Sequence, residues 1–170
     1  MTVTSVQNDP HHLTLTLTAE FDASPERVWQ LWADPRQFER WWGPPTYPAT
    51  ATALDLRPGG KVEYHLTGPD GAATQTNVWD VLEVDPPRLL VFRDSVVDEA
   101  GVPVDEGPSA MMVRFEPIEA GRTRMSIESK FPSSEALKLA LEMDMDKGLT
   151  WAIEQMGAIL AESPSRSGAV

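Results

Sequence analysis

The feature that most constrains the fold is a pair of short helical segments that ends in two adjacent tryptophans. Ser24 and Pro25 form a helix start, because serine caps the first turn and proline suits the first helical position. Asp34 and Pro35 repeat this arrangement. Gly43 then suits the left-handed residue that ends a helix, and the proline after it prevents continuation. The sequence therefore predicts two short helices in tandem.

Strands are predicted on both sides of these helices. Residues 13–21 alternate apolar side chains with threonine, which is the period of a strand with one buried face. Six further strand-like runs follow the helices, and short turns join most of them, which indicates an antiparallel meander. These runs cover residues 50–57, 61–67, 74–84, 88–95, 110–116 and 122–131. The acidic stretch 97–109 is either the end of a long hairpin or a mobile flap.

A long amphipathic helix is predicted after the last strand. Ser133 and Ser134 provide a cap, and the helix runs to about Ala161. Its ~28 residues would span roughly 40 Å. One face carries Leu137, Leu141, Met145, Leu149, Ala152, Met156 and Ile159. An α+β fold accommodates this order: a curved antiparallel sheet of about six or seven strands wraps around the C-terminal helix, and two short helices follow the first strand.

One domain is expected over residues 13–161. The polar stretch 1–12 is interpreted as a flexible N-terminus, and the Ser-, Pro- and Gly-rich stretch 162–170 as a disordered tail. A chain of 170 residues is large enough to bury a sizeable core without disulfides.

The composition excludes several classes of partner. With 26 acidic and 14 basic residues the net charge is -12, which argues against binding to nucleic acid or to an anionic membrane surface. No run approaches the ~20 apolar residues of a membrane span, and no basic, apolar leader is present, so a cytoplasmic location is expected without membrane insertion. The chain has no cysteine, and its three histidines show no metal-ligand spacing. No metal and no cofactor are expected.

The motifs of this chain resemble those of a known family. They are residues 23–29 after Phe21, then 38–44, 54–60, 81–89, 121–125 and finally Gly148. Each is weak alone, but six in this order are specific. The chain resembles the Aha1-like (activator of Hsp90 ATPase homologue) family of the START-like, or SRPBCC, superfamily over about residues 13–160. That family often has Gly-Trp in the last helix, whereas here Trp151 is separated from Gly148, which leaves open which way Trp151 faces.

The resemblance implies the helix-grip fold, also called START-like or Bet v 1-like. It implies a cavity between the long helix and the sheet, which the superfamily uses for lipids, polyketides and other apolar ligands. It supplies no shared catalytic residues. The co-chaperone role of the eukaryotic relatives belongs to a longer two-domain protein, and a homodimer is an open alternative for this branch.

The candidate ligand-binding residues combine apolar walls with a few polar tips, the usual composition of small-molecule sites. Tyr64 lies on the apolar face of its strand, and Asn77 and Trp79 share a face of theirs. Methionine side chains can repack around varied shapes, although ordinary core packing is the favoured interpretation for them. The full set is Trp41, Tyr64, Asn77, Trp79, Met111, Val113, Met125, Met145 and Leu149.

Several other residues allow both a structural and a functional interpretation. Trp41 and Trp42 either grip a ligand or pack under the cap, and packing is favoured. Gly148 costs about 1 kcal/mol relative to alanine in mid-helix, so either the sheet approaches closely there or the helix leaves cavity space. His65 is expected to face solvent, and Glu142, Asp144 and Asp146 are expected to form a solvated acidic surface.

The sequence therefore predicts binding of an apolar or amphipathic small molecule in a central cavity, with no catalytic residue assigned. Two alternatives remain open: an interaction module with a chaperone or other protein partner, and a cyclase- or hydrolase-like enzyme acting on a polyketide-like substrate. An enzyme would need a buried, poorly paired carboxylate or histidine in the cavity.

Overall fold

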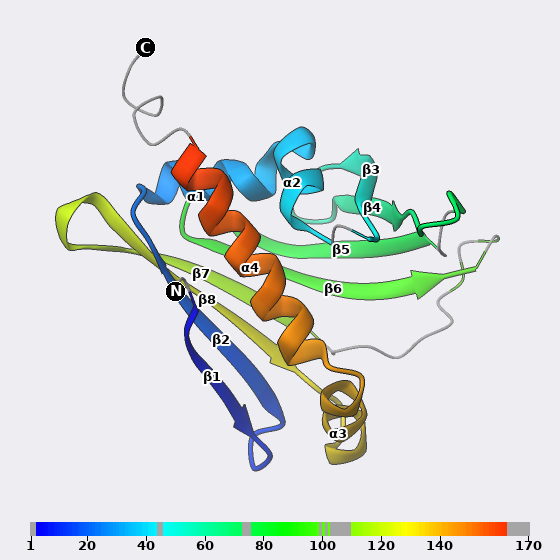
Figure 1. The fold of residues 1–170 in the computed structure, drawn as a ribbon. Helices are drawn as coiled ribbons and strands as arrows, with labels where there is room; N and C mark the ends of the chain where they lie inside the picture. The colour runs from blue at the N-terminus through cyan, green and yellow to red at the C-terminus, as the bar shows by residue number, and fades with distance from the viewer. Residues whose placement is uncertain are drawn as a thin grey trace.

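The computed structural model describes residues 3–43, 46–72, 76–98, 100, 102 and 110–162. These residues form an antiparallel sheet of eight strands in the order β1-β2-β8-β7-β6-β5-β4-β3 (Figure 1). The strands are β1 (Val3–Asp9), β2 (Thr14–Phe21), β3 (Ala49–Leu54), β4 (Lys61–Leu66), β5 (Thr76–Asp85), β6 (Leu89–Val97), β7 (Ala110–Ile118) and β8 (Arg122–Lys130). The helices are α1 (Pro25–Ala33), α2 (Pro35–Trp41), α3 (Ser134–Glu142) and α4 (Met145–Glu162).

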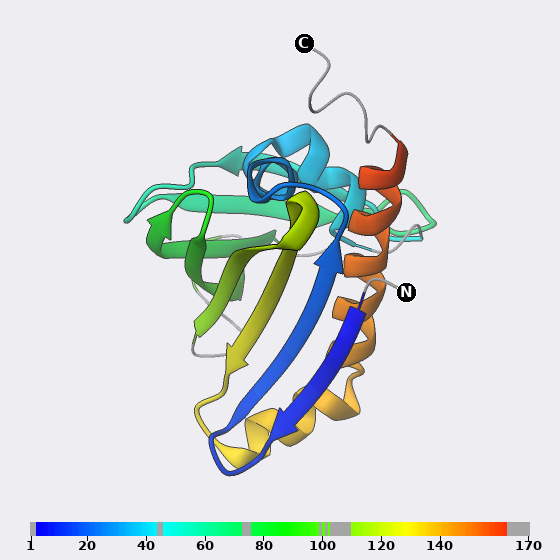
Figure 2. The ribbon, with the colours of Figure 1, turned by 90° about the vertical axis from the view of Figure 1, so that its left-hand side faces the viewer.

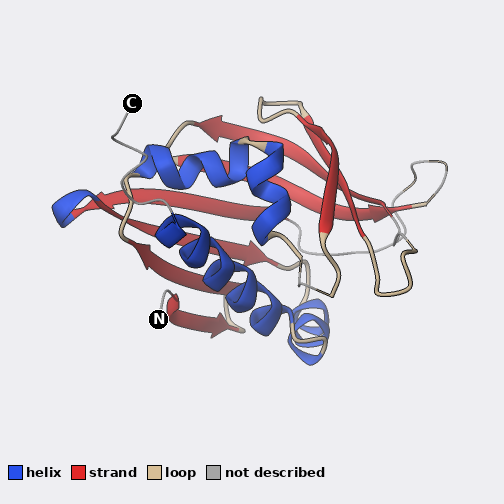
Figure 3. Ribbon diagram, turned by 45° about the horizontal axis from the view of Figure 1, so that its top comes forward, coloured by secondary structure: helices blue, strands red, loops and turns tan. Residues whose placement is uncertain are grey.

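The sheet is strongly curved, and the helices α1, α2 and α4 lie on the same side of it (Figures 2 and 3). Helix α4 packs mainly against α2, α3, β1 and β2, while α1 packs against β7 and β8. The predicted α+β architecture, with a curved sheet around a C-terminal helix and two short helices after a strand, is confirmed. Because α4 lies over one half of the sheet, β4, β5 and β6 are left with a less covered concave face.

The capping predictions for α1 and α2 are confirmed. The Arg27 N–H donates to Ser24 Oγ at 3.2 Å, and the Arg36 N–H donates to Asp34 Oδ1 at 2.9 Å. Each proline occupies the first helical turn, where its missing N–H leaves no bond unmade. Helix α2 ends as Gly43 takes a φ of +88°.

Replacing Gly43 with alanine is expected to destabilise the protein by about 3 kcal/mol, through left-handed strain and overpacking. An added Cβ would lie 2.6 Å from the backbone oxygen of Tyr47. Gly59 is the matched control: its φ is +84°, but an added Cβ meets nothing within 4 Å. Gly59→Ala should therefore cost only about 1 kcal/mol. Urea unfolding of both variants checks this, and equal losses would contradict it.

The expectation of a flexible terminus over residues 1–12 is wrong for β1. Residues Ser5 to Asp9 pair with Thr18 to Thr14 of β2, which raises the strand count from six or seven to eight. The side chains of β1 are mostly exposed, so no apolar alternation signals it. The strand is held by backbone bonds to the edge of β2, which would otherwise present unpaired groups.

The prediction of one continuous C-terminal helix is also wrong. Helix α3 ends at Glu142, and α4 begins at Met145 after Asp144 takes a φ of 60°. Aspartate tolerates this conformation better than most residues. The Asp144 carbonyl accepts the Gly148 N–H at 2.9 Å, so the new helix starts directly after the break. The apolar stripe continues across the break, which is why the pattern gave no sign of it.

The core lies between the concave face of the sheet and the helices, and aromatic rings dominate one end of it. Trp32 contacts Trp41 at 4.7 Å between ring centroids, and Trp79 stacks on Phe92 at 3.9 Å. Alternate side chains of β7 and β8 are buried in this core: Met111, Val113, Phe115, Met125 and Ile127. Most of the stretch 97–109 and the tail from 163 onward lie outside the described residues. In the described part of the chain, no helix combines the length and apolar character needed to cross a bilayer.

Candidate ligand-binding site

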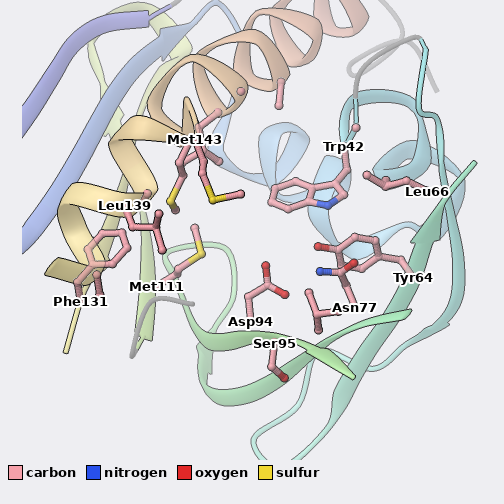
Figure 4. Close-up of a pocket in the computed structure, with 18 of the residues that line it drawn as sticks. Trp42, Tyr64, Leu66, Asn77, Asp94, Ser95, Met111, Phe131, Leu139 and Met143 are labelled. Atoms are coloured by element: carbon pink, nitrogen blue, oxygen red, sulfur yellow. The ribbon is translucent and has the colours of Figure 1, made fainter. Parts of the chain in front are cut away.

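A cavity of about 720 Å³ lies between the less covered half of the sheet and the junction of α3 and α4 (Figure 4). Residues from β4, β5, β6 and β7 form its floor, the end of α2 contributes one side, and α3 and α4 form the other. Its lining comprises Trp42, Gly43, Tyr64, Leu66, Asn77, Asp94, Ser95, Val96, Met111, Phe131, Ser133, Glu135, Ala136, Leu139, Ala140, Met143, Met145, Gly148, Leu149 and Ala152.

The α3 side of the cavity is apolar and open. Met111 and Phe131 are buried at its base. Leu139 and Met143 stand at its rim, where they remain 56% and 75% exposed. Exposed apolar side chains gathered beside a cavity are typical of ligand-binding surfaces, so the mouth is a surface that a bound molecule would cover. Entry requires no opening of the fold.

The opposite side of the cavity is polar, and strand register places its groups together. Tyr64 of β4 pairs with Asn77 of β5, and Asn77 pairs with Val96 of β6. Asp94 lies two residues before Val96, so it shares the face of Tyr64 and Asn77. Figure 4 shows the Tyr64 hydroxyl, the Asn77 amide and the Asp94 carboxylate directed at the same space. One end of the cavity thus offers hydrogen-bonding groups.

Burial controls the ionisation of Tyr64. Desolvation raises the pKa of Tyr64 well above its usual value, and the negative charge of Asp94 raises it further. The phenol therefore stays protonated at neutral pH and can both donate and accept a hydrogen bond. Asp94 itself is half-buried on the same face of the sheet.

Trp42 forms the wall above this polar end, and its indole is held by other rings. It stacks on Phe38 with centroids 5.7 Å apart and meets Tyr64 and Trp79 edge-on at 5.9 and 5.2 Å. Gln155 of α4 fixes the same segment, because its side-chain amide donates to the carbonyls of Trp41 and Gly43 at 2.9 and 3.1 Å. The wall is therefore positioned before any ligand binds.

Gly148 lines the cavity from the first turns of α4. An added Cβ at this position would meet no heavy atom within 4 Å. Of the two explanations for this mid-helix glycine, close approach of the sheet is wrong, and the glycine instead borders open space. Trp151, one turn further on, is 40% exposed and does not line the main cavity; it lines an adjacent shallow hollow with Asp144 and Lys147.

The structure brings five of the nine sequence-predicted residues to the cavity: Tyr64, Asn77, Met111, Met145 and Leu149. The other four do not line it. Trp41 is fully buried, and its indole N–H donates to the Leu31 carbonyl at 2.7 Å, in agreement with the packing interpretation. Trp79 is covered by its aromatic neighbours. Val113 and Met125 are buried further along β7 and β8. Val113 lies two residues, or about 7 Å, along β7 from Met111, and Met125 pairs with Phe115, which lies about 14 Å from Met111.

Sequence reasoning missed Asp94 and Leu139. Asp94 is two residues from both Phe92 and Val96 in β6, so it shares their face of the sheet, and this period is the signal that could have found it. Leu139 was missed because α3 is a separate helix. Among the described residues no group of three histidine or acidic side chains could hold a metal ion, and His65 is half-buried and does not line the cavity.

A curved antiparallel sheet, a C-terminal helix across it and a cavity between the two define the START-like, helix-grip class of proteins. A family model described as Activator of Hsp90 ATPase homolog 1-like protein matches residues 22–161. The chain belongs to this family, which confirms the resemblance seen in its motifs.

Solved structures agree with this assignment. The chain is similar to a protein from Arthrobacter aurescens, with 47% identity, a TM-score of 0.87 and coverage of 95% of this chain and 93% of that one. It is also similar to protein Ms6760 from Mycobacterium smegmatis, with 43% identity, a TM-score of 0.84 and coverage of 95% and 99%. CalU16 from Micromonospora echinospora shares the fold at 21% identity and a TM-score of 0.54, covering 88% of this chain and 86% of that one. A comparison with curated proteins gave no match.

Proposed function

We propose that this protein binds an amphipathic small molecule in the cavity between α3, α4 and the sheet. The observation that supports this most directly is the two-sided lining of a cavity of about 720 Å³. Ligand sites in proteins are typically about 300–1,000 Å³, with mostly apolar walls and a few polar groups that orient the ligand. The volume of the cavity lies in this range, and its lining is divided into an apolar side and a polar end.

The driving force for such binding would be burial of apolar surface. A hydrocarbon or ring system placed over Met111 and Phe131 would be removed from water, and it would also cover the exposed Leu139 and Met143. Each buried CH₂ contributes about 0.8 kcal/mol. The polar end would then fix the orientation of the ligand and contribute to specificity.

The interaction-module and enzyme alternatives have weaker support. An interaction module would need an exposed apolar patch for its partner. The exposed Leu139 and Met143 instead belong to the mouth of the cavity, and Leu82 of β5 is exposed away from them. An enzyme needs a general acid or base, and the ionisable side chains of the described lining are Tyr64, Asp94 and the exposed Glu135. Tyr64 is held neutral and could act only as a proton donor, so a general base would have to be Asp94 or the exposed Glu135.

Titration with N-phenyl-1-naphthylamine, an apolar fluorescent probe, tests the proposal. Saturable binding of one probe per chain is expected, together with a co-purifying small molecule in native mass spectrometry of protein from its source cells. Leu139→Glu places a charge at the mouth and should weaken probe binding about tenfold, which corresponds to about 1.4 kcal/mol. Leu82→Glu makes the same change away from the cavity and should leave it unaltered. Equal effects of the two variants, or no saturable binding, would overturn the proposal.

A further inference from the structure

We infer that the polar end of the cavity is a binding site for an ammonium group, so that the ligand is an amphipathic amine. This rests on the proposed function and adds the chemical class of the ligand to it. The supporting observations are the sign of the charge in the lining, the hydrogen-bonding groups gathered there, and the aromatic faces beside them. Each points to the same kind of head group.

The charged side chains of the described lining are both acidic. They are Asp94 at the polar end and Glu135 on α3; no lysine, arginine or histidine accompanies them among the lining residues that the structure describes. The whole chain adds a net charge of -12. A carboxylate or phosphate head group would meet repulsion here, whereas a cation would be attracted.

The polar groups can also satisfy the donors of such a head group. An ammonium group has three donors and no acceptor. The Asp94 carboxylate, the Asn77 side-chain carbonyl and the Tyr64 oxygen can all accept, and Figure 4 shows these side chains converging from β6, β5 and β4. A hydrogen bond from an ammonium to a carboxylate is about twice as strong as one between neutral groups.

The aromatic side chains beside Asp94 supply a second form of cation recognition. The indole of Trp42 and the ring of Tyr64 both line the cavity, and their centroids lie 5.9 Å apart at an interplanar angle of 83°. A cation in the cavity beside these rings and the carboxylate would be attracted by the π-electrons of the ring face that it meets as well as by the formal charge. Aromatic walls are a known means of recognising alkylammonium groups. The apolar part of the ligand would then extend toward Met111 and Leu139.

Isothermal titration with decylamine, decanol and decanoate, each below its micelle concentration, separates the head group from the shared chain. The wild-type protein should bind decylamine about tenfold more tightly than decanol, and decanoate most weakly. Asp94→Asn should abolish the preference for decylamine, while decanol should still bind saturably, which shows that the cavity is intact. Glu83→Gln removes the same charge from an exposed position of β5 outside the cavity lining and should retain the preference.

The outcomes distinguish this inference from the function on which it rests. If none of the three compounds binds, the proposed function fails. If decanol or decanoate binds as tightly as decylamine, or if Asp94→Asn keeps the preference, the cavity is a ligand site but the ammonium assignment is overturned. A preference that Asp94→Asn removes and Glu83→Gln preserves supports it.

Discussion

Substitution of Gly148 by leucine is expected to weaken ligand binding between about tenfold and a hundredfold without unfolding the protein. The glycine borders the cavity, and an added Cβ meets nothing within 4 Å, so the new side chain can extend into the space where a ligand would lie. A ligand that loses contacts equivalent to one buried leucine loses about 1.5–3 kcal/mol. Titration of the naphthylamine probe against both proteins measures the change.

The stability of the same variant provides an internal check. Glycine in a helix is less favourable than other residues, by about 1 kcal/mol relative to alanine, so Gly148→Leu should be no less stable than the wild type in urea unfolding. Gly148→Ala is the matched control, because one methyl group leaves the cavity mostly open. It should raise the stability by about 0.5–1 kcal/mol and largely retain probe binding. Unchanged affinity in Gly148→Leu would show that the probe binds elsewhere.

Substitution of Trp41 by alanine is expected to reduce the free energy of unfolding by about 3–5 kcal/mol, as for other large aromatic side chains removed from cores. The indole is fully buried against Trp32, Phe38 and Trp42, with centroid distances of 4.7, 5.6 and 5.3 Å. Its indole N–H also donates a hydrogen bond to the Leu31 carbonyl, which links α2 to α1. The urea midpoint should fall while the m-value stays constant.

Two variants separate the parts of this effect. Trp41→Phe retains much of the apolar volume but removes the donor to the Leu31 carbonyl, so it should cost roughly 2 kcal/mol. Trp42→Ala alters a half-buried side chain of the cavity wall, so it should cost less stability than Trp41→Ala and more probe affinity. A loss of less than 1 kcal/mol in Trp41→Ala would contradict the structural role of this residue.

The features of the fold that the sequence predicted correctly depend on residues that lie close together in the chain. Ser24 and Asp34 cap their helices through backbone N–H groups two or three residues away, so the signal and the structure share one stretch of chain. The alternation of Leu15 and Leu17 with threonines likewise reports directly on which face of β2 is buried. These local signals hold in any tertiary structure that buries one face of the helix or strand.

The incorrect predictions concern features without a local signal. Strand β1 has no apolar face of its own and exists because the edge of β2 offers backbone partners. The break before α4 depends on the backbone of Asp144, while the apolar pattern around it continues without interruption. The break also alters the site, since it separates α3 and places Leu139 at the cavity mouth.

The amino-acid sequence was sufficient for the family and the architecture, because its cap, turn and periodicity signals each act over a few residues and occur in a specific order. The cavity was different. Tyr64, Asn77 and Asp94 come from three strands and meet only through the register of β4, β5 and β6. Trp42 rather than Trp41 faces them, because Trp41 is buried in the core and its indole N–H is hydrogen-bonded to the Leu31 carbonyl. Which side chains share a cavity depends on long-range pairing and packing, and no short stretch of this chain encodes that.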